Sequence, residues 1–142
     1  MVSVRKKIDA TRVRAAIEAA EQRTSGEIVV SIARWFWGNP ERAARHAFDR
    51  LGIANTQRRN GVLVFVAPRR RRLVVLPDAA IDAALGTAFC ETVVAAIADR
   101  FRTGDLTGGL VHGIEIIAAQ LAVHFPRGAE DRNELPDDVV GS

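Results

Sequence analysis

The chain has 142 residues, of which 48% are hydrophobic and 26% charged, a composition typical of one globular domain with a substantial core. A single cysteine, Cys90, excludes an internal disulfide and a cysteine-rich zinc site, and no apolar run approaches the ~20 residues of a membrane span. The formal net charge of +3 is too small to imply a nucleic-acid partner, and the basic N-terminal stretch lacks the apolar core of a signal peptide, so we expect a cytoplasmic location.

The first half of the chain predicts a helix, a strand and a second helix. Residues 5–23 carry apolar side chains at helical spacing, which is typical of an amphipathic helix. Residues 27–33 (EIVVSIA) are rich in β-branched side chains and predict a buried strand. After an aromatic run at 35–37, Asn39 and Pro40 form a strong helix start, and this helix is expected to end before Gly52.

The second half begins with two apolar runs, 61–67 (GVLVFVA) and 73–76 (LVVL). Their separation of about five residues predicts an antiparallel hairpin with Pro68 and four arginines at its tip. Asp78 follows as a possible cap of a short helix, 79–85. Two further helices are expected, over 87–101 and 106–124. Within the last one, Gly108–Gly109 predicts close packing of the helix on the sheet.

This order of elements predicts a three-layer α/β/α sandwich. Its small mixed sheet would contain a parallel pair plus the antiparallel hairpin, with helices on both faces. We expect a single domain over residues 1–126. Residues 127–142 are acidic and contain Pro136, so they are expected to form an extended or mobile tail.

The arginines are the first candidate for function. Arg69, Arg70, Arg71 and Arg72 occupy the hairpin tip, and Arg58 and Arg59 precede the first strand of the hairpin. One interpretation is a solvated tip whose charges discourage aggregation between sheet edges. The other is a site for an anionic ligand or an acidic partner. The absence of interleaved aromatic residues disfavours nucleic-acid binding by base stacking.

The aromatic run after the first strand is the second candidate. One or two rings of Trp35, Phe36 and Trp37 would cap the core, whereas an exposed Trp35 or Trp37 beside Arg34 would suit a protein partner.

The chain resembles the TPM-domain family over about residues 8–138. The resemblance rests on the order and spacing of several short motifs, which are TSGEI at 24–28, T-x-x-x-NGVL at 56–63, GD at 104–105, GL at 109–110, Gly113, HFP at 124–126 and NELPD at 133–137. The last two are similar to the short, soluble bacterial branch.

This resemblance implies an α/β/α sandwich, divalent-cation binding in some members and acid-phosphatase activity in the plant ones. In the family pattern the hairpin tip carries an acidic pair, which aligns with Arg69 and Arg70. Calcium and magnesium need oxygen ligands, which guanidinium does not supply, so a cation site built on that pair would be lost. The oxygen ligands that remain for calcium or magnesium are Asp78 and Asp82, one helical turn apart. Glu27 and Asp105 are further possible oxygen ligands, and for each of these four acids the alternative and commoner role is a helix cap or a solvated acid.

The leading hypothesis is therefore a non-catalytic binding module that contacts a protein partner or anionic ligand through the arginine-rich tip, Arg58, Arg59 and the tryptophans. Two alternatives stay open. One is a divalent-cation-dependent phosphatase that uses Asp78 and Asp82. The other is anion or nucleic-acid binding by the arginines alone.

Overall fold

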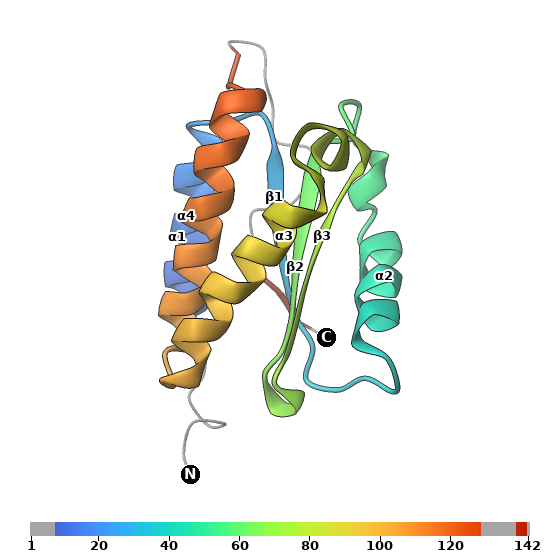
Figure 1. Cartoon of the computed structure of the whole chain (residues 1–142), viewed down its shortest axis with the longest axis vertical. Helices are drawn as coiled ribbons and strands as arrows, with labels where there is room; N and C mark the ends of the chain where they lie inside the picture. Colours follow the sequence, from blue (N-terminus) through green and yellow to red (C-terminus); the bar gives the residue numbers. More distant parts are fainter. Residues whose placement is uncertain (1–7, 129–138, 142) are drawn as a thin grey trace.

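A computed structural model describes residues 8–128 and 139–141. Within these residues, four strands form one sheet in the order β3-β2-β1-β4, and four α-helices pack around it (Figure 1). The elements are α1 (Ala10–Glu21), β1 (Glu27–Ile32), α2 (Pro40–Arg50), β2 (Gly61–Ala67), β3 (Arg72–Pro77), α3 (Ala79–Arg102), α4 (Leu106–His124) and β4 (Val140–Gly141).

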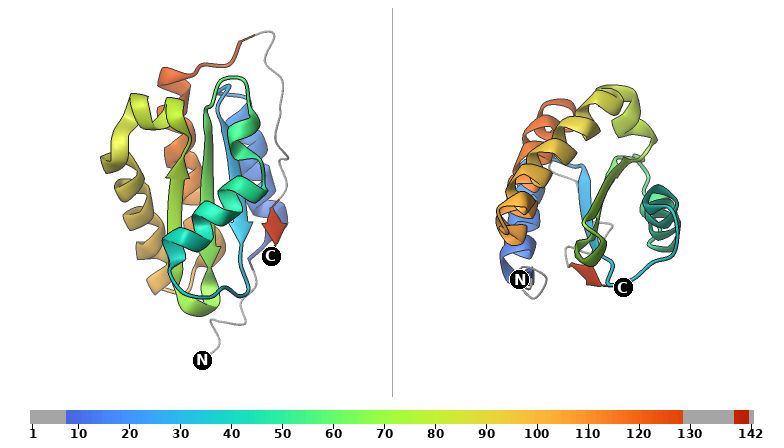
Figure 2. Two further views of the ribbon diagram at one scale, coloured as in Figure 1. Left: turned by 90° about the vertical axis from the view of Figure 1, so that its right-hand side faces the viewer. Right: turned by 60° about the horizontal axis from the view of Figure 1, so that its bottom comes forward.

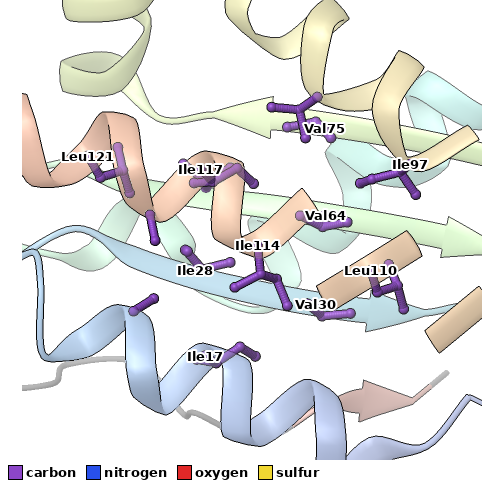
Figure 3. Close-up of a cluster of buried hydrophobic side chains, with 14 of the residues drawn as sticks. Ile17, Ile28, Val30, Val64, Val75, Ile97, Leu110, Ile114, Ile117 and Leu121 are labelled. Atoms are coloured by element: carbon purple, nitrogen blue, oxygen red, sulfur yellow. The ribbon is translucent and has the colours of Figure 1, made fainter. Parts of the chain in front are cut away.

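The sheet is the middle layer of an α/β/α sandwich, as predicted. Helix α2 covers one face, and α1, α3 and α4 cover the other (Figure 2). All seven residues of β2 are buried, because alternate side chains of this central strand enter cores on opposite faces. Val62, Val64 and Val66 enter the larger core, in which side chains from α1, α4 and the strands converge (Figure 3).

Strand pairing agrees with the mixed sheet expected from the sequence. β1 and β2 are parallel, from Glu27 opposite Gly61 to Ile32 opposite Val66. β2 and β3 are antiparallel and are joined by a 3-10 turn at Pro68–Arg70. The hairpin therefore carries its arginines at one end of the sheet, the end where β1 also leaves toward α2 (Figure 1).

The sequence did not suggest β4. Val140 and Gly141 pair in parallel with Ser31 and Ile32 at the free edge of β1, which Figure 2 shows beside the sheet. The acidic segment 129–138 of the expected tail lies outside the described residues, and the domain boundary at residue 126 stays a prediction.

Helix α1 differs from its expected limits, whereas the predicted break within α3 is observed. α1 begins at Ala10, where the Asp9 side chain accepts hydrogen bonds from two backbone amides. The expected helices 79–85 and 87–101 are confirmed as the two parts of α3, which meet at Gly86, where φ 76° and ψ 179° are not helical. By length and composition α3 and α4 could each cross a membrane, and here both pack against the sheet.

The glycines of α4 allow close packing, but against α3 rather than against the sheet as the sequence suggested. A Cβ atom at Gly109 would lie 2.8 Å from the Phe101 ring, and one at Gly113 would lie 2.4 Å from Cδ1 of Ile97. Ile97 is fully buried, so it has little room to give way. The two helices can approach this closely because these side chains are absent.

Replacing Gly113 with alanine tests this packing. Helix propensity alone would stabilise the variant by ~1 kcal/mol, whereas the forced displacement of Ile97 costs about 1–3 kcal/mol. We expect a net loss of about 1 kcal/mol in the free energy of unfolding, measured with urea. Gln120→Ala, on the exposed face of the same helix, is the control. A Gly113→Ala variant more stable than wild type would contradict the packing.

Candidate partner-binding surface

The structure separates the six candidate arginines into two groups. Arg59 lies just before β2, whereas Arg69 to Arg72 follow it. β2 has seven residues and at ~3.3 Å per residue spans roughly 20 Å. Arg58 and Arg59 therefore belong to the opposite end of the sheet and do not share a surface with the hairpin tip.

Arg59 forms a two-pronged ion pair with Asp78. Its Nε donates to Oδ2 over 2.7 Å and its Nη2 donates to Oδ1 over 2.8 Å. Asp78 is 3% exposed, and its Oδ1 also accepts from the backbone N–H of Ala79, at the first residue of α3. The predicted cap is thus confirmed, and it ties the start of β2 to the start of α3.

The ion pair involves an unfavourable backbone conformation at Arg59, and it lowers the pKa of Asp78. Arg59 has φ 52°, in the left-handed region that non-glycine residues rarely adopt. Burial raises the pKa of Asp78, but the hydrogen bonds from Arg59 and Ala79 and the nearby positive charges outweigh it. The net pKa of Asp78 lies below its ordinary value of 3.8.

The acids expected as metal ligands are dispersed among structural roles. Both oxygens of Asp78 are engaged by Arg59, and Asp82 is exposed one turn further on. Asp105 caps α4 through the N–H of Gly108, and Glu27 is buried at the start of β1. Within residues 8–128 and 139–141, no three acid, histidine or cysteine side chains are arranged to hold a metal ion. This donor set does not fit calcium or magnesium unless the ion displaces Arg59 from Asp78, and the site stays a prediction.

Replacing Asp78 tests its structural role. Asp78→Ala removes both the cap and the ion pair and should lower the free energy of unfolding by roughly 1–3 kcal/mol, whereas Asp78→Asn keeps a capping oxygen and should lose less. Because the folded-state pKa is lowered, the stabilisation is present above pH ~4. The difference in the free energy of unfolding between wild type and Asp78→Asn, measured with urea, should become smaller as the pH falls below 3.8. A difference independent of pH would contradict the charged pair.

At the other end of the sheet, Arg70 joins the hairpin tip to the loop between β1 and α2. Its guanidinium lies over the Phe36 ring, with 4.3 Å from Cζ to the ring centroid. Its Nη1 donates to the carbonyl of Gly38 over 3.0 Å. A cation–π contact with a backbone hydrogen bond holds the loop against the tip. Of the tip arginines, Arg70 therefore lies beside the loop that carries the tryptophans.

This loop presents both tryptophans to solvent. Trp35 is 63% exposed and Trp37 is 81% exposed, and their rings contact edge to face with centroids 5.1 Å apart. Phe36 instead points inward and contacts Phe65 of β2 at 5.9 Å between centroids. The middle ring of the run thus anchors the loop, and the outer two form an exposed apolar pair.

A groove of about 460 Å³ lies beside the tryptophan pair, between the loop and α2. Arg42, His46 and Arg50 line it from α2. The sequence analysis named none of these three residues as a candidate. Arg42, His46 and Arg50 follow one another at intervals of four residues, which places them on one face of a helix, and this spacing was the available signal. The groove's remaining lining is apolar and consists of Ala33, Trp35, Phe36, Trp37, Ala43, Ala47 and Phe65.

Intrinsic fluorescence tests the exposure of the tryptophans directly. The chain has two tryptophans and no tyrosine, so all indole emission comes from this loop. We expect the native emission maximum to lie close to that of the urea-unfolded chain, and acrylamide to quench both states to a similar extent. A large red shift on unfolding would mean that the rings are buried.

Three of the motifs behind the family resemblance, at 24–28, 56–63 and 124–126, meet at the end of the sheet opposite the hairpin tip. Gly104 lies near the tip instead, and the motif at 133–137 is outside the described residues. The Thr24 hydroxyl donates to the carbonyl of Leu121 over 3.1 Å and also bonds the carbonyl of Phe125. The N–H of Glu27 donates to the carbonyl of Asn60 over 3.1 Å. A Cβ atom at Gly26 would lie 2.7 Å from Leu121. These residues hold β1, β2 and α4 together, so they account for the fold rather than for the exposed surface.

The TPM domain family model matches residues 6–120. The chain belongs to the TPM domain family. No functionally curated protein matches its sequence. Family membership accounts for the sandwich.

Solved structures agree with this assignment. The TPM domain described here is 32% identical to the BA42 protein of the psychrophilic bacterium Bizionia argentinensis, with a TM-score of 0.90 and full coverage of both chains. The N-terminal domain of the cg2496 protein of Corynebacterium glutamicum is 17% identical, with a TM-score of 0.63 and coverage of 87% of this chain and 77% of that one. An N-terminal domain from P. gingivalis is 15% identical, with a TM-score of 0.62 and coverage of 82% and 76%. The last two similarities concern the fold alone.

Proposed function

We propose that this TPM domain is a soluble, cytoplasmic interaction module that binds an acidic protein segment carrying an apolar anchor. The binding surface is the tryptophan groove, made of Trp35, Trp37, Arg42, His46 and Arg50, together with the adjoining Arg70. The observation that carries the proposal is the exposed tryptophan pair beside a groove lined by cationic side chains.

The chemistry of the groove supports an acidic partner. The side chains that line it include two arginines and a histidine, and no carboxylate is found among them in the described part of the chain. Tryptophan and arginine are the residues that most often dominate binding energy at protein interfaces. An apolar side chain of the partner would lie against the indole rings, and its carboxylates would pair with Arg42 and Arg50 at the rim.

The same lining favours binding over catalysis. It contains no serine, threonine, cysteine or carboxylate that could act as a nucleophile. His46 is the only side chain in this lining of a type commonly used for general acid–base catalysis. The lining therefore offers no nucleophile for a group-transfer reaction other than His46.

Three synthetic decapeptides test the proposal, with tryptophan emission as the signal. The first has five carboxylates and a central leucine, the second replaces the leucine with serine, and the third replaces the acids with lysine. We expect the first to shift the emission to shorter wavelength, with an affinity that falls as salt is added. Binding should be weaker for the second peptide and absent for the third.

Matched variants separate the groove from general electrostatics. Arg42→Glu and Arg50→Glu should each weaken binding of the first peptide by about tenfold or more. Arg100→Glu, an exposed charge reversal on α3, should leave it within about twofold. Absence of binding by the leucine peptide at low salt, or equal losses in all three variants, would refute the proposed surface.

A further inference from the structure

A second cavity lies on the other side of the hairpin tip, between the tip and the turn that joins α3 to α4. Its volume is about 380 Å³. Figure 1 shows these two turns at the same end of the molecule. The lining residues come from the tip, from the last turn of α3 and from the start of α4, and are Pro68, Arg71, Arg72, Leu73, Ala98, Phe101, Arg102, Gly104 and Leu106.

The cavity has a cationic side and an apolar side. Arg71 and Arg72 of the tip and Arg102 of α3 contribute three guanidinium groups from segments about thirty residues apart. Asp99 forms an ion pair with Arg102 on the exposed surface, so it offsets one of these charges. Leu73, Phe101 and Leu106 supply an apolar wall. A positively charged rim over an apolar wall complements a molecule with an anionic head and an apolar body.

The backbone at the tip provides an independent observation. Arg71 has φ 55°, and of the non-glycine residues that the structure describes only it and Arg59 have positive φ. This conformation carries a steric cost for a residue with a Cβ atom, and glycine or asparagine would adopt it more easily. Arg59 is held by its ion pair with Asp78, whereas Arg71 has its side chain at the cavity. Strained backbone of this kind is common where a side chain has a binding role.

We propose that this cavity binds a small organic anion, with the anionic group held by Arg71, Arg72 and Arg102 and an aromatic or aliphatic body against Phe101 and Leu73. This site goes beyond the proposed partner-binding function, because it lies on the opposite side of the tip and shares no lining residue with the tryptophan groove. The volume is near the lower limit for ligand pockets, which range over about 300–1,000 Å³. A single-ring compound suits this size better than a nucleotide.

Isothermal titration with three probes tests the site. Phenylphosphonate carries both the anion and the ring, inorganic phosphate carries the anion alone, and benzyl alcohol carries the ring alone. We expect phenylphosphonate to bind about tenfold more tightly than inorganic phosphate, because the ring removes apolar surface from water, and benzyl alcohol not to bind measurably. Equal affinity for the two anions, or no binding of phenylphosphonate at low salt, would overturn the proposal.

Variants locate the ligand. Arg102→Gln and Arg71→Gly should each weaken phenylphosphonate binding by about tenfold, since each removes a charged hydrogen-bond donor. Arg71→Gly should be at least as stable as wild type in urea, because glycine relieves the strained φ, so its loss of affinity cannot be ascribed to unfolding. Arg69→Gln, at the same tip but outside the cavity lining, should bind as wild type does. Unchanged affinity in both Arg102→Gln and Arg71→Gly would place the anion elsewhere.

One further variant separates this site from the tryptophan groove. Trp37→Ser should abolish the emission response to the acidic peptide but leave phenylphosphonate affinity within about twofold, because Trp37 does not line the cavity. A parallel loss of phenylphosphonate binding in Trp37→Ser would show that the probe occupies the groove and would refute a separate site.

Discussion

The contact between Arg70 and the loop that follows β1 organises the exposed end of this sandwich. The Phe36 ring packs against Phe65 of β2 and so anchors the loop to the sheet. The Arg70 guanidinium lies over the Phe36 ring and also donates to the carbonyl of Gly38. Without these contacts the loop would have no fixed position relative to the hairpin. With them, two indole rings stay exposed beside a cationic groove, an arrangement that costs hydrophobic free energy unless a partner covers it.

The two ends of the sheet have different roles. At the end where β1 and β2 begin, Thr24 bonds the end of α4, the Asn60 amide donates to the carbonyl of Ser25, and the Arg59–Asp78 ion pair ties β2 to α3. Thr24, Ser25, Arg59 and Asn60 lie within the segments on which the family resemblance rests. At the opposite end, the tip carries arginines that contribute little to the core. Ligand specificity can vary there without altering the fold.

Much of this fold could be predicted from local patterns. The continuous apolar run of β2 and the Asn39–Pro40 helix start gave the observed element limits, because each pattern reflects interactions within a few residues.

The candidate surface could be predicted only in part. Arg58 and Arg59 were grouped with the tip, yet a whole strand separates them from it, and Arg59 pairs with a residue nineteen positions later. Arg102 lies near the hairpin tip, and β4 pairs with β1, only because of the tertiary fold. The local sequence carries no signal for either contact.

The most direct test of the role of Arg70 is the fluorescence anisotropy decay of the two tryptophans in Arg70→Gln, with Arg69→Gln as the matched control from the same turn. If Arg70 holds the loop, its loss should increase the amplitude of fast indole motion, whereas Arg69→Gln should match wild type. Equal decays in wild type and both variants would show that the loop keeps its position without Arg70. In that case the hairpin tip would have no part in forming the tryptophan surface.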